Sequence, residues 1–312
     1  MKSLSKIVLV TAIAAASSAQ AELLAMDDSA MSATTGQAGL SIEINAAEIS
    51  IGAVDYQDKG FISMKDIHFG GGLAAFGGPG DGIFNDVLIT VDVVGASADD
   101  LGQKYMGEEY ISRAAALVVG GGQVSGNYVD PGINDGDLVI AINAPDLSKM
   151  LQSVDYGLRI GSIGLGKSTE TPGAVTDGTL LLQNLDMAGY FGPTEIIIDG
   201  NSNQMNISMY FNAEGSLDMP FMAVTTDFAI HNSRGTDQVW LGTQDKGNSM
   251  AHVQLNIGEG TASSGASALA VDVQNFEADI DLVNLTLGSA PAIGSLYITD
   301  FRLTANTVIY GH

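Results

Sequence analysis

The chain has 312 residues, of which 46% are hydrophobic, and 36 acidic against 12 basic residues give it a formal net charge of −24. A chain with this charge repels the phosphates of nucleic acids and of anionic lipids, so nucleic acid is excluded as a partner. Cysteine is absent, so the fold must be held by burial, by β-pairing and by any bound cation rather than by disulfides.

Residues 1–21 have the pattern of an export signal. Two lysines precede a short apolar run, which ends in the small-x-small sequence Ala19-Gln20-Ala21 that signal peptidase cuts after. The run is shorter than the about 20 apolar residues that a membrane span needs. We therefore predict a mature chain that begins at Glu22, has no transmembrane span, and is exported to the periplasm, the cell surface or the extracellular space of a Gram-negative cell.

Most of the chain after residue 39 alternates between apolar and polar residues. Clear examples are the segments 87–93, 138–142, 207–211 and 253–257. This period of two is typical of half-buried antiparallel strands. We expect an acidic N-terminal segment at 22–39 and one all-β domain at 40–312. The predicted fold class is a large antiparallel sandwich or prism-like architecture with internal pseudo-repeats, and a β-helix or solenoid is the alternative.

Three segments of the chain share one pattern, G-x-Φ-x-Φ-x-[DN]-Φ-x-Φ, where Φ is apolar. They are GFISMKDIHF (60–69), GTLLLQNLDM (178–187) and GSLYITDFRL (294–303). Each follows a strand pattern that ends in a glycine: Gly52, Gly161 or Gly288. We therefore predict repeat units near 48–69, 157–187 and 284–303, each consisting of a strand, a glycine-bounded connection and a second strand.

The alternation of apolar and polar residues changes phase inside each repeat, because an apolar residue directly follows the Asp or Asn of the shared pattern. A β-bulge or a sharp bend at Asp66, Asn184 and Asp300 would return the next apolar side chains to the same face. We expect the apolar repeat positions to be core residues. These positions are Ile62, Met64, Leu180, Leu182, Leu296 and Ile298.

Two acidic, glycine-rich segments are candidate cation sites. DPGINDGDL (130–138) and GPGDGIFND (78–86) bring together the oxygen ligands and sharp turns that calcium loops use. The first does not fit an EF-hand, because its twelfth position is Ala141. We interpret both segments as turns, with calcium as the alternative. The candidate ligands for calcium are Asp130, Asn134, Asp135 and Asp137.

No catalytic or cofactor-binding motif is found. The four histidines are His68, His231, His252 and His312, and none has a partner at a metal-ligand spacing. No G-x-S-x-G elbow or phosphate-binding glycine loop occurs, and nothing singles out a pair of carboxylates for glycoside hydrolysis. We therefore expect a protein that is not an enzyme and has no catalytic or cofactor-binding residues.

The N-terminal segment carries a motif of the form L-x-x-x-D-D-x-x-[ML]-x-x-x-T-G-Q-A-G. Its residues are Leu23, Asp27, Asp28, Met31, Thr35, Gly36, Gln37, Ala38 and Gly39. It resembles the start of a family of proteobacterial secreted proteins, some of which are named pilus-system proteins of the FilA type. The resemblance implies a surface-exposed or pilus-associated role and implies no catalytic residue.

Composition, export signal and resemblance together favour a secreted, non-enzymatic structural or adhesive protein of the cell surface. Pilus or filament association would make its partners envelope proteins or further copies of the chain. The alternative is an extracellular or periplasmic module that binds a hydrophobic or carbohydrate ligand.

Overall fold

The computed structural model describes residues 39–72, 82–84, 87–95, 129, 131–143, 154–176, 178–232 and 250–311. All the described residues belong to one compact unit, residues 39–312. The predicted signal peptide and nearly all of the acidic N-terminal segment therefore lie outside the described residues. Within them, no helix is long and apolar enough to cross a membrane.

The described residues form strands, together with one 3₁₀ turn, η4, at Pro220–Met222. The strands are β1 (Leu40–Ile44), β2 (Ile49–Gln57), β3 (Phe61–Gly70), β4 (Val87–Val93), β5 (Leu138–Asn143), β6 (Val154–Gly166), β7 (Thr179–Ile198), β8 (Met205–Met219), β9 (Val224–His231), β10 (Ala251–Thr261), β11 (Ser267–Leu287) and β12 (Gly294–Ile309). All strand pairings among the described residues are antiparallel and join the twelve strands into one sheet. The predicted all-β antiparallel class is confirmed, and the described residues do not form the alternative β-helix or solenoid.

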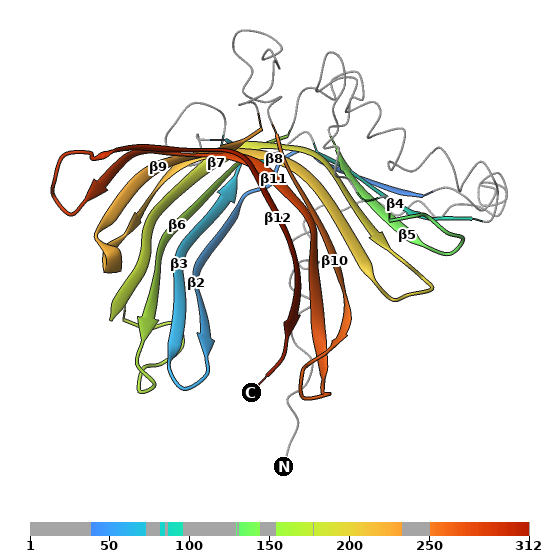
Figure 1. Ribbon diagram of the computed structural model, residues 1–312, viewed down its shortest axis with the longest axis horizontal. Coiled ribbons are helices and arrows are strands. Elements are labelled where there is room, and N and C mark those ends of the chain that lie inside the picture. The colour runs from blue at the N-terminus through green and yellow to red at the C-terminus, as the bar shows by residue number, and fades with distance from the viewer. Residues whose placement is uncertain are drawn as a thin grey trace, which may run out of the picture. The chain divides into compact units, whose positions relative to one another are not determined.

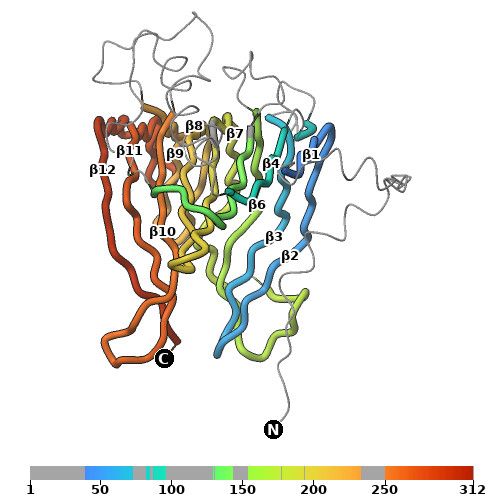
Figure 2. The backbone as a smooth tube through the Cα atoms, turned by 90° about the vertical axis from the view of Figure 1, so that its right-hand side faces the viewer, coloured from blue at the N-terminus to red at the C-terminus, as the bar shows by residue number. Residues whose placement is uncertain are grey.

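The sheet has two leaves that share four long strands. The first leaf has the order β1-β4-β5-β7-β8-β10-β11-β12, and the second has β2-β3-β6-β7-β8-β9-β11-β12. Each long strand changes partner along its length: β8 pairs with β10 up to Phe211 and with β9 from Ala213. Figure 1 shows these long strands curving where one leaf passes into the other, and Figure 2 shows β12 and the pair β1/β2 at opposite sides of the sheet.

The three predicted repeats are β-hairpins: β2–β3, β6–β7 and β11–β12. The predicted irregularities are also confirmed, because Asp66, Asn184 and Asp300 have positive φ angles of 52°, 52° and 54°. In β12, Asp300 is the extra residue of a bulge opposite β11. The sequence comparison missed a fourth such residue, Asn284, with φ 54° in β11.

The predicted ends of two repeat strands are wrong. We expected strands to stop at Gly52 and Gly161, but β2 and β6 continue for several residues beyond them. Gly161 is needed because it lies opposite the left-handed residue Asp66, whereas a Cβ atom at Gly52 would meet nothing within 4 Å. A Cβ atom at Gly161 would lie only 2.9 Å from Cβ of Asp66, so any side chain there would force the two strands apart.

The register places the strand residues on two faces of very different character. In the first leaf, for example, Ile42, Ile89 and Ile142 are cross-strand neighbours on one face, while Ser41, Thr90 and Ala141 are neighbours on the other. The same alternation continues across the second leaf, where the bulges keep apolar residues on one side. One face is therefore almost entirely apolar, and the other carries the polar and charged side chains together with a small buried apolar cluster of Val94, Val139 and Ile197.

The prediction that the apolar repeat positions are core is wrong. Ile62 is 45% exposed and Leu296 is 50% exposed, while Met64, Leu180, Leu182 and Ile298 are only half-buried. Five of these six residues share the apolar face, as expected, but a register shift in β7 pairs Leu180 with Gly164, which is a cross-strand neighbour of Ser63 on the other face. The error is in the assumption that a shared apolar face is a covered one.

Candidate functional site

The apolar face is the most unusual surface of the molecule. We define it by the large side chains that the strand register places on this side of the sheet and that are 38–67% exposed. They are Leu40, Ile42, Ile49, Ile51, Val54, Tyr56, Ile62, Val93, Leu165, Ile198, Leu269, Leu287, Leu296, Leu303 and Ile309. On the opposite face of the strands only Tyr190, Tyr297 and Val308 are comparably exposed. Contiguous apolar surface of this extent is rare on a soluble monomer and marks a site of interaction.

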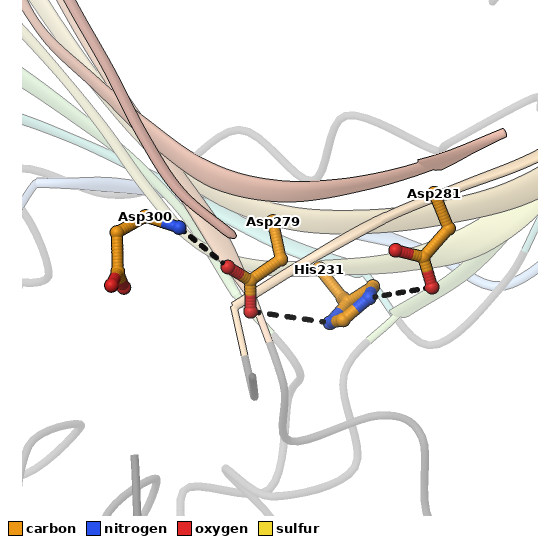
Figure 3. A network of polar contacts seen from close by, with 4 residues as sticks. All are labelled: His231, Asp279, Asp281 and Asp300. Carbon is orange, nitrogen blue, oxygen red and sulfur yellow. Dashed lines mark hydrogen bonds and ion pairs between the residues drawn. The ribbon is translucent and has the colours of Figure 1, made fainter. Parts of the chain in front are cut away.

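The apolar face lies on the inner side of the curved strands. Figure 3 shows the polar side chains of His231, Asp279 and Asp281 on the convex side of the ribbons. In β11, Asp279 and Asp281 alternate with Ile280 and Leu282, whose side chains must therefore point to the concave side. The two leaves thus turn their apolar sides inward.

Where the leaves meet, the apolar face is filled by aromatic rings. Phe69, Phe84, Tyr156 and Phe191 form one cluster, in which the rings of Tyr156 and Phe191 stack with centroids 4.0 Å apart. The Tyr156 hydroxyl donates a hydrogen bond to the backbone oxygen of Asn212 at 2.9 Å, and burial raises the pKa of this phenol. This satisfied, stacked cluster anchors the bend, and the exposed apolar residues extend outward from it.

The fully buried alanines Ala251 and Ala278 lie on the same face near the bend. A larger side chain at either position would have to displace neighbours in a space that is already closed. Small residues at the bend and large exposed residues away from it give a face that is rigid at its centre and accessible toward the hairpins.

The convex face carries two polar clusters at the level of the bend, and the first is centred on His231. Its Nδ1 lies 3.8 Å from Oδ2 of Asp279 and its Nε2 lies 3.4 Å from Oδ2 of Asp281 (Figure 3). Asp279 is fully buried, and its Oδ1 accepts a hydrogen bond from the backbone N–H of Asp300 at 2.9 Å. This carboxylate therefore stabilises the β12 bulge, which gives the cluster a structural role.

The second cluster brings together a serine, a histidine and an asparagine from three strands. Ser208 Oγ lies 3.0 Å from Nε2 of His252, and Asn275 Nδ2 lies 2.9 Å from its Nδ1. The ring of Tyr210 stacks on the imidazole at 4.4 Å. Sequence analysis missed this trio, since its members are far apart in the chain and meet only through the register of β8, β10 and β11.

The order of contacts in this trio matches a nucleophile, a base and an orienting group. The burial of the trio does not match a catalytic site, because Ser208 is 5% exposed and both His252 and Asn275 are 0% exposed. Burial also lowers the pKa of His252 to about 4, which makes the imidazole a weak base. A substrate carbonyl would have to come within about 3 Å of Ser208 Oγ, which the burial prevents. The trio is better explained as a buried polar layer.

Gln254 extends this polar layer. Its side-chain amide forms a two-way bond with the backbone of Val129, donating to the carbonyl oxygen at 2.6 Å and accepting from the N–H at 2.9 Å. The same Nε2 lies 3.2 Å from Oδ1 of Asn206, whose own amide donates to Gln274. The backbone of Val129 thus lies against the convex face at Gln254.

The candidate calcium ligands are only partly covered by the structure. Asp130 lies outside the described residues, as do the acidic residues Asp81 and Asp86 of the other loop. Asp137 is fully buried, and its carboxylate accepts hydrogen bonds from the backbone N–H groups of Asn134 at 2.6 Å and Gly200 at 2.9 Å.

Asn134 and Asp135 are exposed at the same turn. In the described ranges no three His, Asp or Glu side chains are grouped as metal ligands. The Asp137 carboxylate supports the interpretation of this segment as a turn, because it accepts hydrogen bonds from backbone N–H groups. Calcium binding stays a prediction.

Comparison with known proteins adds little to this geometry. A family of unknown function, DUF6160, matches residues 1–95, which is under a third of the chain. No curated protein and no solved structure matches. Function therefore has to be inferred from the two faces and the edges of the sheet.

Proposed function

We propose that the protein is an exported, non-enzymatic envelope protein whose apolar face binds a hydrophobic ligand with long chains, such as the acyl chains of a lipid. The observation that carries this proposal is the segregation of exposed large apolar side chains on one face of the sheet. Of the two classes of ligand that the sequence left open, a carbohydrate fits less well. It would need many hydrogen-bonding groups, and this face offers mainly aliphatic side chains.

The size of the face favours an extended ligand. Eight strands separated by seven spacings of about 4.8 Å make the first leaf about 34 Å wide. Covering about 400 Å² of apolar surface would contribute about 10 kcal/mol, which is close to the cost of association. A small compact ligand would therefore bind weakly, whereas a long chain could cover enough of the face to bind well.

Charge argues against docking on an anionic membrane surface. The chain carries a formal charge of −24. The acidic residues of the strands lie mostly on the convex face, with Glu259 as an exception near a hairpin end. Such a molecule is repelled by anionic headgroups at a distance. The proposal is therefore that individual acyl chains lie against the apolar face, and that the protein does not insert into a bilayer.

The test is binding of the fluorescent fatty acid cis-parinaric acid to the mature protein. The variant Ile62→Gln, Leu296→Gln makes the apolar face polar at two exposed positions and should weaken binding. Tyr297→Gln is the matched control, because Tyr297 is 58% exposed on the opposite face directly after Leu296. Saturable binding that only the first variant weakens supports the proposal. Absence of binding, or equal loss in both variants, contradicts it.

A structural role in a filament or pilus is the second candidate. Besides the N-terminal resemblance, one feature of the fold favours it: within the described residues, the edge strands β1, β2 and β12 each have a neighbouring strand on one side only. Unpaired strand edges are templates for pairing with another chain.

A further inference from the structure

Both edges of the sheet are formed by exposed strands. We call β1 together with β2 the leading edge and β12 the trailing edge. β12 is 16 residues long and almost entirely exposed, and β1 and β2 are exposed nearly throughout. Neither edge contains a proline or a lysine, and the features that could protect them as open strands are the Asp300 bulge in β12 and two charged side chains in each edge.

The edges run in opposite directions. Each leaf contains eight strands, and every neighbouring pair is antiparallel. An even number of antiparallel strands leaves the first and last strands antiparallel to each other. A second copy placed beside the first in the same orientation would therefore continue the antiparallel sheet. The alternation of hydrogen-bonded and non-hydrogen-bonded pairs would also continue, because it has a period of two strands.

The register of the sheet predicts which residues would meet. Following the cross-strand neighbours from Leu303 through Phe276, Val253, Met209, Thr194, Ile142 and Ile89 leads to Ile42. A copy displaced straight across the sheet would thus place its Ile42 opposite Leu303. Tracing the second leaf in the same way places Ile49 opposite Leu296.

Both traces give the same register, although they run through different leaves. Ile42 and Ile49 are seven residues apart in the chain, and so are Leu296 and Leu303. The extra residue that the Asp300 bulge adds to β12 is matched by the length of the link between β1 and β2. In this register residues 294–305 of β12 face residues 40–51 of the leading edge across the bend, while the end of β2 extends six residues past the start of β12.

Side-chain chemistry is complementary in this register. Leu303 and Ile42 both belong to the apolar face, so the junction would continue that face without a break. One residue away, Arg302 of the trailing edge would lie opposite Glu43 of the leading edge on the convex face. These are opposite charges in positions where cross-strand pairs interact.

From these observations we infer that the chain associates with further copies of itself by antiparallel pairing of β12 with β1 and β2 of the next copy. The contact uses different surfaces on the two partners, so it does not close after two copies and generates a linear or helical assembly. The apolar faces of successive copies then form one continuous surface. This association is independent of whether the apolar face binds acyl chains.

Cross-linking tests the register directly, because the chain has no natural cysteine. Ser41 and Thr304 are exposed and lie opposite each other in the inferred junction. Under mild oxidation the variant Ser41→Cys, Thr304→Cys should give a ladder of covalent dimers, trimers and larger species. The matched control Glu43→Cys, Thr304→Cys is displaced by two residues, where Cα atoms about 7–8 Å apart exceed disulfide range, and should give much less.

A charge exchange tests the same junction without a covalent bond. Arg302→Glu places two acids opposite each other and should weaken self-association, measured by sedimentation velocity, by about tenfold. Glu43→Arg should weaken it similarly, and the two changes combined should restore it. Melting temperatures of dilute samples show whether each variant is folded.

Three results would overturn the inference. They are a monomer at all concentrations, a cross-linked dimer from Thr304→Cys alone, which would indicate β12 pairing with itself, and equal ladders from the two double-cysteine variants. Restoration by the combined charge exchange, together with a ladder specific to the Ser41 and Thr304 pair, supports it.

Discussion

The left-handed conformation of Asp300 allows a stability prediction that depends on backbone geometry alone. Asp300 has a φ of 54°, and its backbone N–H donates to the buried carboxylate of Asp279. Aspartate, asparagine and glycine tolerate this conformation, whereas a β-branched residue does not. We predict that Asp300→Val destabilises the fold and that Asp300→Asn and Asp300→Gly change it little.

The magnitudes follow from the conformation. Each substitution keeps the N–H donor, so the bond to Asp279 is present in every variant. Glycine removes a left-handed penalty of about 1 kcal/mol but adds a similar amount of unfolded-state entropy, so the free energy of unfolding should change by less than about 0.5 kcal/mol. Valine should lower the free energy of unfolding by about 1–3 kcal/mol.

The measurement is urea denaturation of the four proteins, with an unchanged m-value as evidence that the unfolding reaction is the same. Thr299→Val is the control, since Thr299 is an exposed neighbour in β12 that is not among the positive-φ residues. It should cost less than about 0.5 kcal/mol. Equal stability of Asp300→Val and Asp300→Gly would show that the bulge does not impose the left-handed conformation on residue 300.

Further predictions concern buried and paired charges. Because burial lowers the pKa of His252 from 6.5 to about 4, the unfolded chain binds its proton first, so stability should fall by about 2 kcal/mol between pH 7 and pH 5, and His252→Gln should remove this part of the pH dependence. Asp137→Asn should cost about 1.5–3 kcal/mol in denaturation experiments, because its carboxylate holds two backbone N–H groups. Calcium, magnesium and sodium at matched ionic strength should raise the melting temperature equally, whereas a calcium-specific rise lost in Asp130→Ala, Asp135→Ala would assign a calcium site. Arg159→Lys should lower the free energy of unfolding by only about 0.5 kcal/mol, and by less at high salt, since the bidentate ion pair of Arg159 with Asp186 in β7 is partly exposed.

The backbone irregularities could be predicted from the sequence because they leave a phase change in the apolar pattern. In the repeats, an apolar residue directly follows Asp66, Asn184 and Asp300, and only a bulge or bend keeps both sides of the pattern on one face. Asn284 follows the same rule, with Leu282 before it and Leu285 after it. Asn284 was not predicted, because it lies in the strand that precedes the third repeat and so outside the shared pattern.

Exposure could not be predicted, because periodicity identifies which residues share a face and says nothing about what covers that face. Ile62 and Leu296 illustrate this: their pattern is that of a sandwich core, yet each is about half exposed. The opposite error occurs on the convex face. Ser208, His252 and Gln254 occupy the polar positions of their strands, which predicts solvent exposure, but they are buried. One signal was available, since the alternating polar residues of β8 and β10 are mostly uncharged.

The distribution of charge decides how the proposed assembly can grow. The acidic side chains of the strands lie mostly on the convex face, so two copies that approach through their convex faces repel each other. The edges carry few charges: β12 has one acid and one base, and β1 and β2 have one acid each. Repulsion is therefore weakest where strands can pair, which directs association along the sheet.

Salt should then act in two ways. Screening of the convex face removes the barrier to lateral contact, while screening of the Arg302–Glu43 pair weakens only one of many contacts in the edge junction. Growth by edge pairing should persist at high ionic strength, and side-by-side association should appear only there.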